Sequence, residues 1–139
     1  MIRLLIVLLM LSLGLMSCDL ADEVDDAIID ISGRVSHDGN SISGAIVLLV
    51  EGTDVSGVNL ANGSFTDNSG NYLILDVDPG NYYVIAVDDA NGNLEYDEGT
   101  DRLGIHGIDL SLTIPDVTPE QIEVDEEDLE DIDITYLEG

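Results

Sequence analysis

Basic residues are nearly absent from this sequence: its 139 residues include three arginines and no lysine, against 30 aspartates and glutamates, and the formal net charge is −27. Nucleic acids bind through lysine and arginine side chains that neutralise phosphates, so the composition excludes nucleic-acid binding. Anionic lipid headgroups are repelled for the same reason, and contact with a membrane would have to come from acyl chains. The partners that such a charge favours are basic proteins and divalent ions.

Cysteine occurs once and tryptophan is absent. A single cysteine excludes an internal disulfide, and with only two histidines the softer ligands that zinc prefers are too few. Neither His37 nor His106 stands in a catalytic arrangement and no GxSxG motif occurs, so we expect that the protein is not an enzyme. Glycan binding stays open as an alternative, and it would depend on an exposed cluster of Tyr72, Tyr82 and Tyr83.

The first eighteen residues have the pattern of a secretory signal peptide, with one positive charge at Arg3, an apolar run over 4–15 and a small Ser17 before Cys18. They also resemble the lipobox of bacterial lipoproteins, in which that cysteine is acylated and becomes the mature N-terminus. The resemblance implies that residues 1–17 are removed and that Cys18 carries a covalent lipid. The alternative is an ordinary signal peptide beside a stray cysteine. A transmembrane anchor fits poorly, because the apolar run is shorter than the ~20 residues that span a bilayer.

The rest of the chain has the size of one small domain. We expect residues 18–27 to form a lipidated acidic tether and residues 28–139 a single domain. Within that domain, residues 116–131 are strongly acidic and are expected to be a solvated, partly disordered segment. The predicted location is the bacterial cell envelope, where the lipid-anchored chain faces the periplasm or is exposed at the surface.

Short strands separated by turn residues run through this domain. From 29 to 35, apolar and polar residues alternate as in a half-buried strand, and the apolar run 45–50 suits a strand that is buried on both faces or lies at the centre of a sandwich. A hairpin loop is predicted at 68–71, one helical turn at 119–122, and further strands at 72–75, 82–87, 108–114 and 132–136. The pattern predicts an all-β fold, an Ig-like or prealbumin-like antiparallel β-sandwich of about seven short strands.

Four short motifs carry a family resemblance, and they lie at residues 31–35, 42–47, 66–72 and 79–84. In this order they resemble the carboxypeptidase regulatory-like domains, which are prealbumin-like, or transthyretin-like, β-sandwiches of bacterial surface proteins. The resemblance covers about half of the mature chain and implies an accessory, adhesive or binding module. Hydroxyisourate hydrolases share the prealbumin-like fold but close with a Tyr-Arg-Gly-Ser tail. This chain ends in Tyr136-Leu137-Glu138-Gly139, so that activity is not carried over.

One loop carries metal-binding chemistry. Oxygen-bearing side chains stand at its first, third, fifth and ninth positions, and the backbone carbonyl at its seventh position completes part of a calcium shell. The predicted ligands are Asp89, Asn91, Asn93, Glu95 and Asp97, with Glu98 or Asp101 as further candidates. The loop departs from the EF-hand pattern because Leu94 stands where glycine gives the sharp bend, and Thr100 where a bidentate glutamate closes the site. The alternative is an Asn-Gly-rich connection whose acids face water.

Taken together, these features predict a lipid-anchored envelope protein that serves as a non-enzymatic binding or assembly module and is stabilised by calcium. A glycan-binding or adhesion module is the first alternative. A transthyretin-like hydrolase is the more distant one, and it would need a pocket that converges on His37 or His106.

Overall fold

The computed structural model describes residues 28–52, 63–108 and 119–139, and within them the chain is an all-β antiparallel sandwich without helices. Nine strands occur, some only two residues long. They are β1 (Ile31–Arg34), β2 (Ser36–His37), β3 (Asn40–Ser41), β4 (Ile46–Val50), β5 (Gly63–Phe65), β6 (Asn71–Ile74), β7 (Gly80–Asp88), β8 (Arg102–Ile105) and β9 (Ile122–Val124). The predicted fold class is confirmed.

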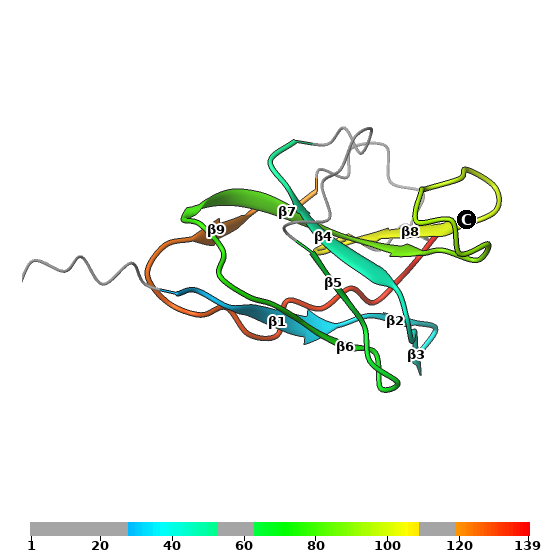
Figure 1. Cartoon of the computed structure of the whole chain (residues 1–139), viewed down its shortest axis with the longest axis horizontal. Helices are drawn as coiled ribbons and strands as arrows, with labels where there is room; N and C mark the ends of the chain where they lie inside the picture. Colours follow the sequence, from blue (N-terminus) through cyan, green and yellow to red (C-terminus); the bar gives the residue numbers. More distant parts are fainter. Residues whose placement is uncertain (1–27, 53–62, 109–118) are drawn as a thin grey trace, which may run out of the picture.

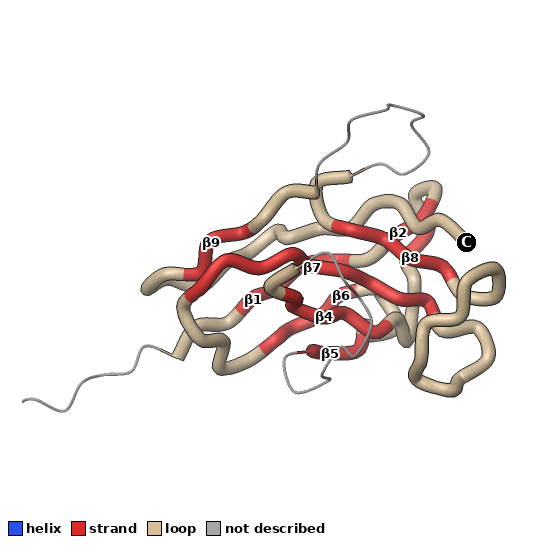
Figure 2. Tube along the Cα trace, turned by 90° about the horizontal axis from the view of Figure 1, so that it is seen from above, coloured by secondary structure: helices blue, strands red, loops and turns tan. Residues whose placement is uncertain are grey.

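The strands form two layers (Figure 1). The larger sheet has the order β5-β4-β7-β8, and β9 pairs with the first residues of β7. The smaller layer consists of the β1–β6 pair, to which the β2–β3 hairpin is attached. The long strand β7 is the centre of the larger sheet, because β4, β8 and β9 all pair with it (Figure 2).

The main core fills the space between the two layers. The alternation predicted for residues 29–35 is confirmed, since Ile29, Ile31 and Val35 are fully buried and the residues between them are not. From the larger sheet, Val47 and Val84 face the same core. Burial of each such aliphatic side chain contributes about 1.5–3 kcal/mol relative to leaving it in water.

The larger sheet is apolar on its other face as well. Ile46, Leu48, Ile85 and Val87 form a second cluster there, and each of them is at most 5% exposed. The prediction that residues 45–50 are buried on both faces is therefore confirmed. This explains why β4 reads as a continuous apolar run, whereas β1 alternates.

The turn at residues 68–71 is present, but it does not join a hairpin. Asp67 and Asn71 close the turn by a backbone hydrogen bond of 2.8 Å. However, β5 before it pairs with β4 in the larger sheet, and β6 after it pairs with β1 in the smaller one. The hairpin prediction was wrong because turn residues determine a local reversal, while the pairing of the flanking strands depends on distant partners.

Apart from the short β2–β3 hairpin, β8 and β9 also lie where the sequence did not predict strands. β8 begins at Arg102, directly after the acidic loop, and β9 lies within the acidic segment 116–131. The predicted helical turn at 119–122 is absent, because Ile122 pairs with Tyr82 and starts β9. The many acidic residues around this strand favoured the prediction of a solvated segment. In the structure, however, Ile122 and Val124 are buried and Glu123 is exposed, as in a half-buried strand. Of the predicted strand 108–114, all but Ile108 lies outside the described residues.

Residues 129–139, called here the C-terminal segment, join the two layers. Leu129 forms an isolated parallel bridge to Ile31 in β1, Ile134 forms one to Val35 directly after β1, and Glu138 forms an antiparallel bridge to Leu103 in β8. In Figure 1 this orange and red trace runs beside β1 and ends next to β8. The strand predicted at 132–136 is therefore an extended segment with single bridges instead of a regular ladder, although Ile134 is fully buried as the alternation required.

Residues 1–27 lie outside the described residues, and with them the predicted signal peptide, Cys18 and the acidic tether. Among the residues that the structure describes, no helix is long and apolar enough to cross a membrane.

Candidate functional site

The predicted calcium loop connects β7 to β8 and lies at the end of the sandwich where the C-terminus is found (Figures 1 and 2). A Cβ atom added to Gly139 would lie 2.6 Å from the carbonyl oxygen of Asp101 and 2.7 Å from Cγ of Arg102. The end of the chain thus rests on the last residues of the loop.

Asp89 organises the first half of the loop. Its Oδ1 accepts hydrogen bonds from the N–H groups of Gly92 (2.7 Å) and Asn93 (3.3 Å), and its Oδ2 accepts one from Leu94 N–H (2.8 Å). The backbone hydrogen bond from Leu94 is the largest cause that lowers the pKa of this carboxyl below its ordinary value. Asp89 is therefore held as a carboxylate by the loop itself.

Leu94 takes the left-handed backbone conformation, with φ of 64°. It occupies the sixth position of the loop, where the EF-hand pattern places glycine for its sharp turn. A residue with a Cβ atom adopts this conformation at a cost of roughly 1–2 kcal/mol. The bend that the calcium pattern requires is therefore present, even though the residue that usually provides it is missing.

Three polar side chains from the middle of the loop converge. Nδ2 of Asn91 and Nδ2 of Asn93 donate hydrogen bonds to Oδ2 of Asp97, at 2.8 and 2.7 Å. The oxygens of the two amides accept the N–H groups two residues further on, at 3.0 Å in Asn93 and 2.9 Å in Glu95. In this arrangement the amide hydrogens balance the charge of Asp97 where a cation would otherwise do so.

Asp101 closes the far end of the loop and is fully buried. Its Oδ1 accepts the N–H of Ala90 (3.0 Å), and its Oδ2 accepts the N–H of Asp97 (2.8 Å). The single carboxylate therefore ties the first turn of the loop to the last. The sequence marked Asp101 as a further metal ligand, but in the structure both of its oxygens serve backbone amides.

An ion pair stands at the base of the loop. Arg102 Nε lies 3.0 Å from Oδ2 of Asp88, and its Nη2 contacts the same oxygen. Asp88 and Arg102 are also partners in the β7–β8 ladder. The negative charge of the carboxylates in this loop is thus offset in part by this arginine and in part by the amide groups that surround Asp89, Asp97 and Asp101.

The structure brings the side chains of Asn91 and Asn93 to Asp97, whereas the Asp89 carboxylate accepts backbone N–H groups of the same loop. Glu95 and Glu98 are exposed, as are the two asparagines. No group of three or more histidine, cysteine, aspartate or glutamate side chains is placed to hold a metal ion in the described parts of the chain. A calcium site here would thus rest on two carboxylates, two amide oxygens and the carbonyl of Glu95. These hard oxygen donors suit calcium in kind.

The tyrosines that glycan binding would need are not gathered on the surface. Tyr72 and Tyr82 are buried, and their hydroxyl groups donate to the carbonyl oxygens of Ile132 (2.5 Å) and Asp78 (3.1 Å). Desolvation is the main cause that raises the pKa of both phenols. Tyr83 points to the opposite face from Tyr82, as expected for neighbours in a strand, and is half-buried. No stacking platform forms from these three residues.

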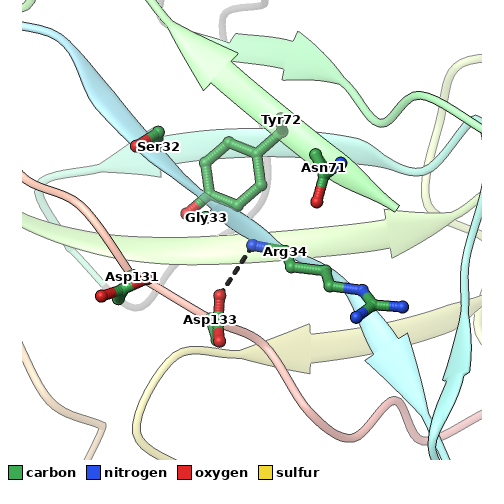
Figure 3. A pocket seen from close by; sticks show the side chains of 7 residues that line it. All are labelled: Ser32, Gly33, Arg34, Asn71, Tyr72, Asp131 and Asp133. Carbon is green, nitrogen blue, oxygen red and sulfur yellow. Dashed lines mark hydrogen bonds between the residues drawn. The ribbon is translucent and has the colours of Figure 1, made fainter. Parts of the chain in front are cut away.

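A shallow pocket lies between β1, β6 and the C-terminal segment (Figure 3). The backbone N–H of Arg34 donates to Asp133 Oδ1 at 2.8 Å across it, and the ring of Tyr72 lies over Gly33. Its lining consists of Ser32, Gly33, Arg34, Asn71, Tyr72, Asp131 and Asp133. Neither His37 nor His106 lines this pocket. No local sequence motif marked it, since three distant segments form it.

Comparisons with known proteins are sparse. No family model matches the chain, and no curated protein matches it. Among solved structures, it is similar to the crystal structure of a DUF3823 family protein from Parabacteroides merdae ATCC 43184, with 14% sequence identity and a TM-score of 0.42. The match covers 81% of this chain and 48% of that one, so the chain spans about half the length of that protein. A likeness of this size carries no argument about function.

Proposed function

We propose that this protein is a non-enzymatic module of the bacterial cell envelope, anchored by a lipid on Cys18 and stabilised by calcium in the loop of residues 89–101. The lipobox-like sequence before Cys18 supports the anchor, and the β-sandwich is a fold suited to a binding or assembly role. The strongly acidic surface favours a basic protein as the partner.

The observation that carries the calcium part is the arrangement of Asp89, Asn91, Asn93 and Asp97 around the left-handed residue Leu94. These four side chains and the carbonyl of Glu95 would hold the ion. When bound, calcium would neutralise the carboxylates of Asp89 and Asp97, which accept hydrogen bonds from uncharged amide groups. Its role would be structural, because the loop joins β7 to β8 and its end supports the C-terminus.

Thermal unfolding of the full chain in detergent tests this proposal. The melting temperature is measured in chelator, in calcium and in matched magnesium. A site in the extracellular affinity range, with a dissociation constant of about 10⁻⁴–10⁻³ M, raises the melting temperature by roughly 5 °C when calcium is about tenfold in excess of that constant. Asp89→Ala and Asp97→Ala are expected to abolish the rise.

Asp67→Ala is the matched control, because Asp67 also closes a turn by accepting backbone N–H groups but lies outside the loop. It is expected to lower the melting temperature and to leave the calcium response intact. An equal rise with magnesium, or a response that survives Asp97→Ala, would reduce the calcium effect to charge screening. The anchor is tested separately: Cys18→Ser is expected to move the protein from the membrane fraction to the soluble fraction.

A further inference from the structure

The C-terminal segment covers one outer edge in each layer of the sandwich. In the smaller layer it runs along β1, and both backbone groups of Ser32 bond to it, the N–H at 2.8 Å and the carbonyl at 3.0 Å. In the larger sheet it ends on β8, where Leu103 and Glu138 exchange backbone hydrogen bonds of 2.7 and 2.8 Å. Beside this bridge, the N–H of Leu137 donates to Nδ1 of His37 at 3.3 Å. The chain itself therefore closes the edges of β1 and β8.

The outer edge of β6 lies on the opposite side of β1 from the C-terminal segment (Figure 1). Val35 N–H donates to the carbonyl of Gly70, and hydrogen-bonded positions alternate along an antiparallel pair. Leu73 and its partner Ser32, three positions along the ladder, are therefore not bonded to each other. The N–H and carbonyl of Leu73 consequently point away from β1, and within the described ranges they have no hydrogen-bond partner. Such an open edge is a template for another strand.

Two large apolar side chains are exposed along this edge. Leu73 is 48% exposed and Leu75 is 62% exposed, whereas Ile74 between them is buried in the main core. Because side chains alternate along a strand, the two leucines lie on the same outer face of the smaller layer. The edge of β5 in the larger sheet carries one such side chain, Phe65, which is 55% exposed. The edge of β6 thus offers the longer apolar strip.

Carboxylates stand at both ends of the β6 edge. Asp67 accepts the N–H of Asn71, the first residue of β6, at 2.9 Å, and Asp76 lies two residues after the end of the strand. In extended chain, five residues span ~17 Å. Both carboxylates are exposed, and among the described residues neither takes part in an ion pair. Arg34 of β1 contacts Ser41 Oγ in the β2–β3 hairpin instead.

We propose that the open edge of β6 takes up an extended segment of a basic protein, which adds a strand to the smaller layer. This inference rests on the proposed function, because it names the surface that binds the basic partner. The main chain of the partner bonds to the N–H and carbonyl of Leu73, and its apolar residues pack beside Leu73 and Leu75. Lysine or arginine residues about five positions apart reach Asp67 and Asp76. A second copy of this chain does not fit, because its net charge of −27 repels an identical molecule.

Nuclear magnetic resonance on the full chain in detergent, with a synthetic peptide as the probe, tests the site. The probe has eight residues and blocked ends, with lysine at its second and seventh positions and alternating valine and threonine between them. When its concentration is about tenfold above the dissociation constant, the Leu73 amide is expected to gain roughly tenfold protection from hydrogen exchange. The amides of β4 serve as an internal reference and are expected to keep theirs.

A second probe separates strand addition from attraction between opposite charges. It is the same peptide with methyl groups on its four central backbone nitrogens, so it keeps both lysines and all side chains but loses the donors that would pair with β6. Its affinity is expected to be roughly tenfold lower, as the loss of one or two hydrogen bonds allows. This comparison uses the unaltered protein and does not depend on the folding of a variant.

Matched lysine variants locate the site on the protein. Leu73→Lys places a positive charge on the edge and is expected to lower the affinity for the first probe about tenfold. Phe65→Lys makes the same change at a similarly exposed position on the edge of β5 and is expected to leave the affinity within about twofold. Asp76→Asn keeps a residue that tolerates the φ of 56° and is expected to weaken binding about two- to fivefold.

Three results would overturn the docking site on β6. They are equal binding of the two probes, an unchanged exchange rate of the Leu73 amide, and a loss of affinity in Phe65→Lys as large as in Leu73→Lys. None of these results bears on the proposed anchor or calcium loop, which are judged by the fractionation of Cys18→Ser and by the melting temperature in calcium. Equal binding of the two probes would also leave a basic partner in place and refute strand addition alone.

Discussion

The turn at residues 67–71 and the loop at residues 89–101 use the same device with different outcomes. In each, the first aspartate accepts backbone N–H groups: Asp67 those of Ser69 (2.7 Å) and Asn71 (2.9 Å), and Asp89 chiefly those of Gly92 and Leu94. In each, a backbone hydrogen bond is the main cause that lowers the pKa of the carboxyl. One aspartate thus replaces the hydrogen bonds that strand pairing would otherwise supply.

The two connections differ in which groups still need a hydrogen-bond partner or an opposite charge once the first aspartate has accepted its N–H groups. In the short turn, Asp67 suffices, and Gly70 provides the left-handed residue with φ of 81°. The longer loop places Leu94 in that conformation and needs Asp101 to fix its far end. It also gathers the additional carboxylate of Asp97. The longer loop thus carries more negative charge than the short turn, and amide hydrogens or a cation must offset that charge.

The largest expected effect comes from adding a methyl group at the left-handed glycine of the short turn. A Cβ atom on Gly70 would lie 2.5 Å from the carbonyl oxygen of Val35, in addition to the cost of a positive φ. Gly70→Ala is therefore expected to lower the free energy of unfolding by about 3 kcal/mol, measured by urea denaturation. Gly92→Ala is the control from the loop, since Gly92 has φ of 72° but no heavy atom within 4 Å of the added Cβ. It is expected to cost only about 1 kcal/mol. Equal costs would show that space around Gly70 is not what matters.

The next effect concerns Asp101, the buried carboxylate that fixes the far end of the longer loop and has no counterpart in the short turn. Asp101→Ala removes the acceptor of two backbone N–H groups from a fully buried position, and it is expected to cost about 2 kcal/mol of unfolding free energy. Asp101→Asn keeps one acceptor oxygen and is expected to cost about half as much. Urea denaturation of both variants provides the measurement. If the two variants are equally destabilised, the negative charge of Asp101 matters rather than its hydrogen bonds.

Side-chain periodicity explains which parts of the fold were predictable. The alternation around Ile31 and the apolar run of β4 predicted both strands, because burial on one face or two directly determines the pattern. Strand pairing depends on partners far apart in the chain, so the separation of β5 and β6 onto different sheets was not predictable. β9 was not predicted because its two buried apolar residues, Ile122 and Val124, are surrounded by acidic residues, and such a composition is typical of a solvated segment.

For the candidate site, spacing carried most of the information. The loop pattern predicted that Asp89, Asn91, Asn93 and Asp97 come together, because a tight loop turns alternate side chains to the same side. It did not predict that Asp101 serves two backbone amides, which depends on how the loop is closed. The contact between His37 and Leu137 was beyond sequence reasoning altogether, since 100 residues separate the two in the chain.

The smallest expected effect tests whether the left-handed conformation of Leu94 lowers the free energy of unfolding. Leucine stands there in the longer loop, whereas the short turn has glycine in that conformation. Leu94→Gly is expected to raise the free energy of unfolding by about 0.5 kcal/mol, because relief of the left-handed strain outweighs the greater freedom of glycine in the unfolded chain. Leu94→Ala retains the Cβ atom and is expected to give no gain. Both are measured as shifts of the urea midpoint at an unchanged slope. Since the Leu94 side chain is 54% exposed, a gain shared by both variants would trace the effect to removal of an exposed apolar group rather than to backbone strain.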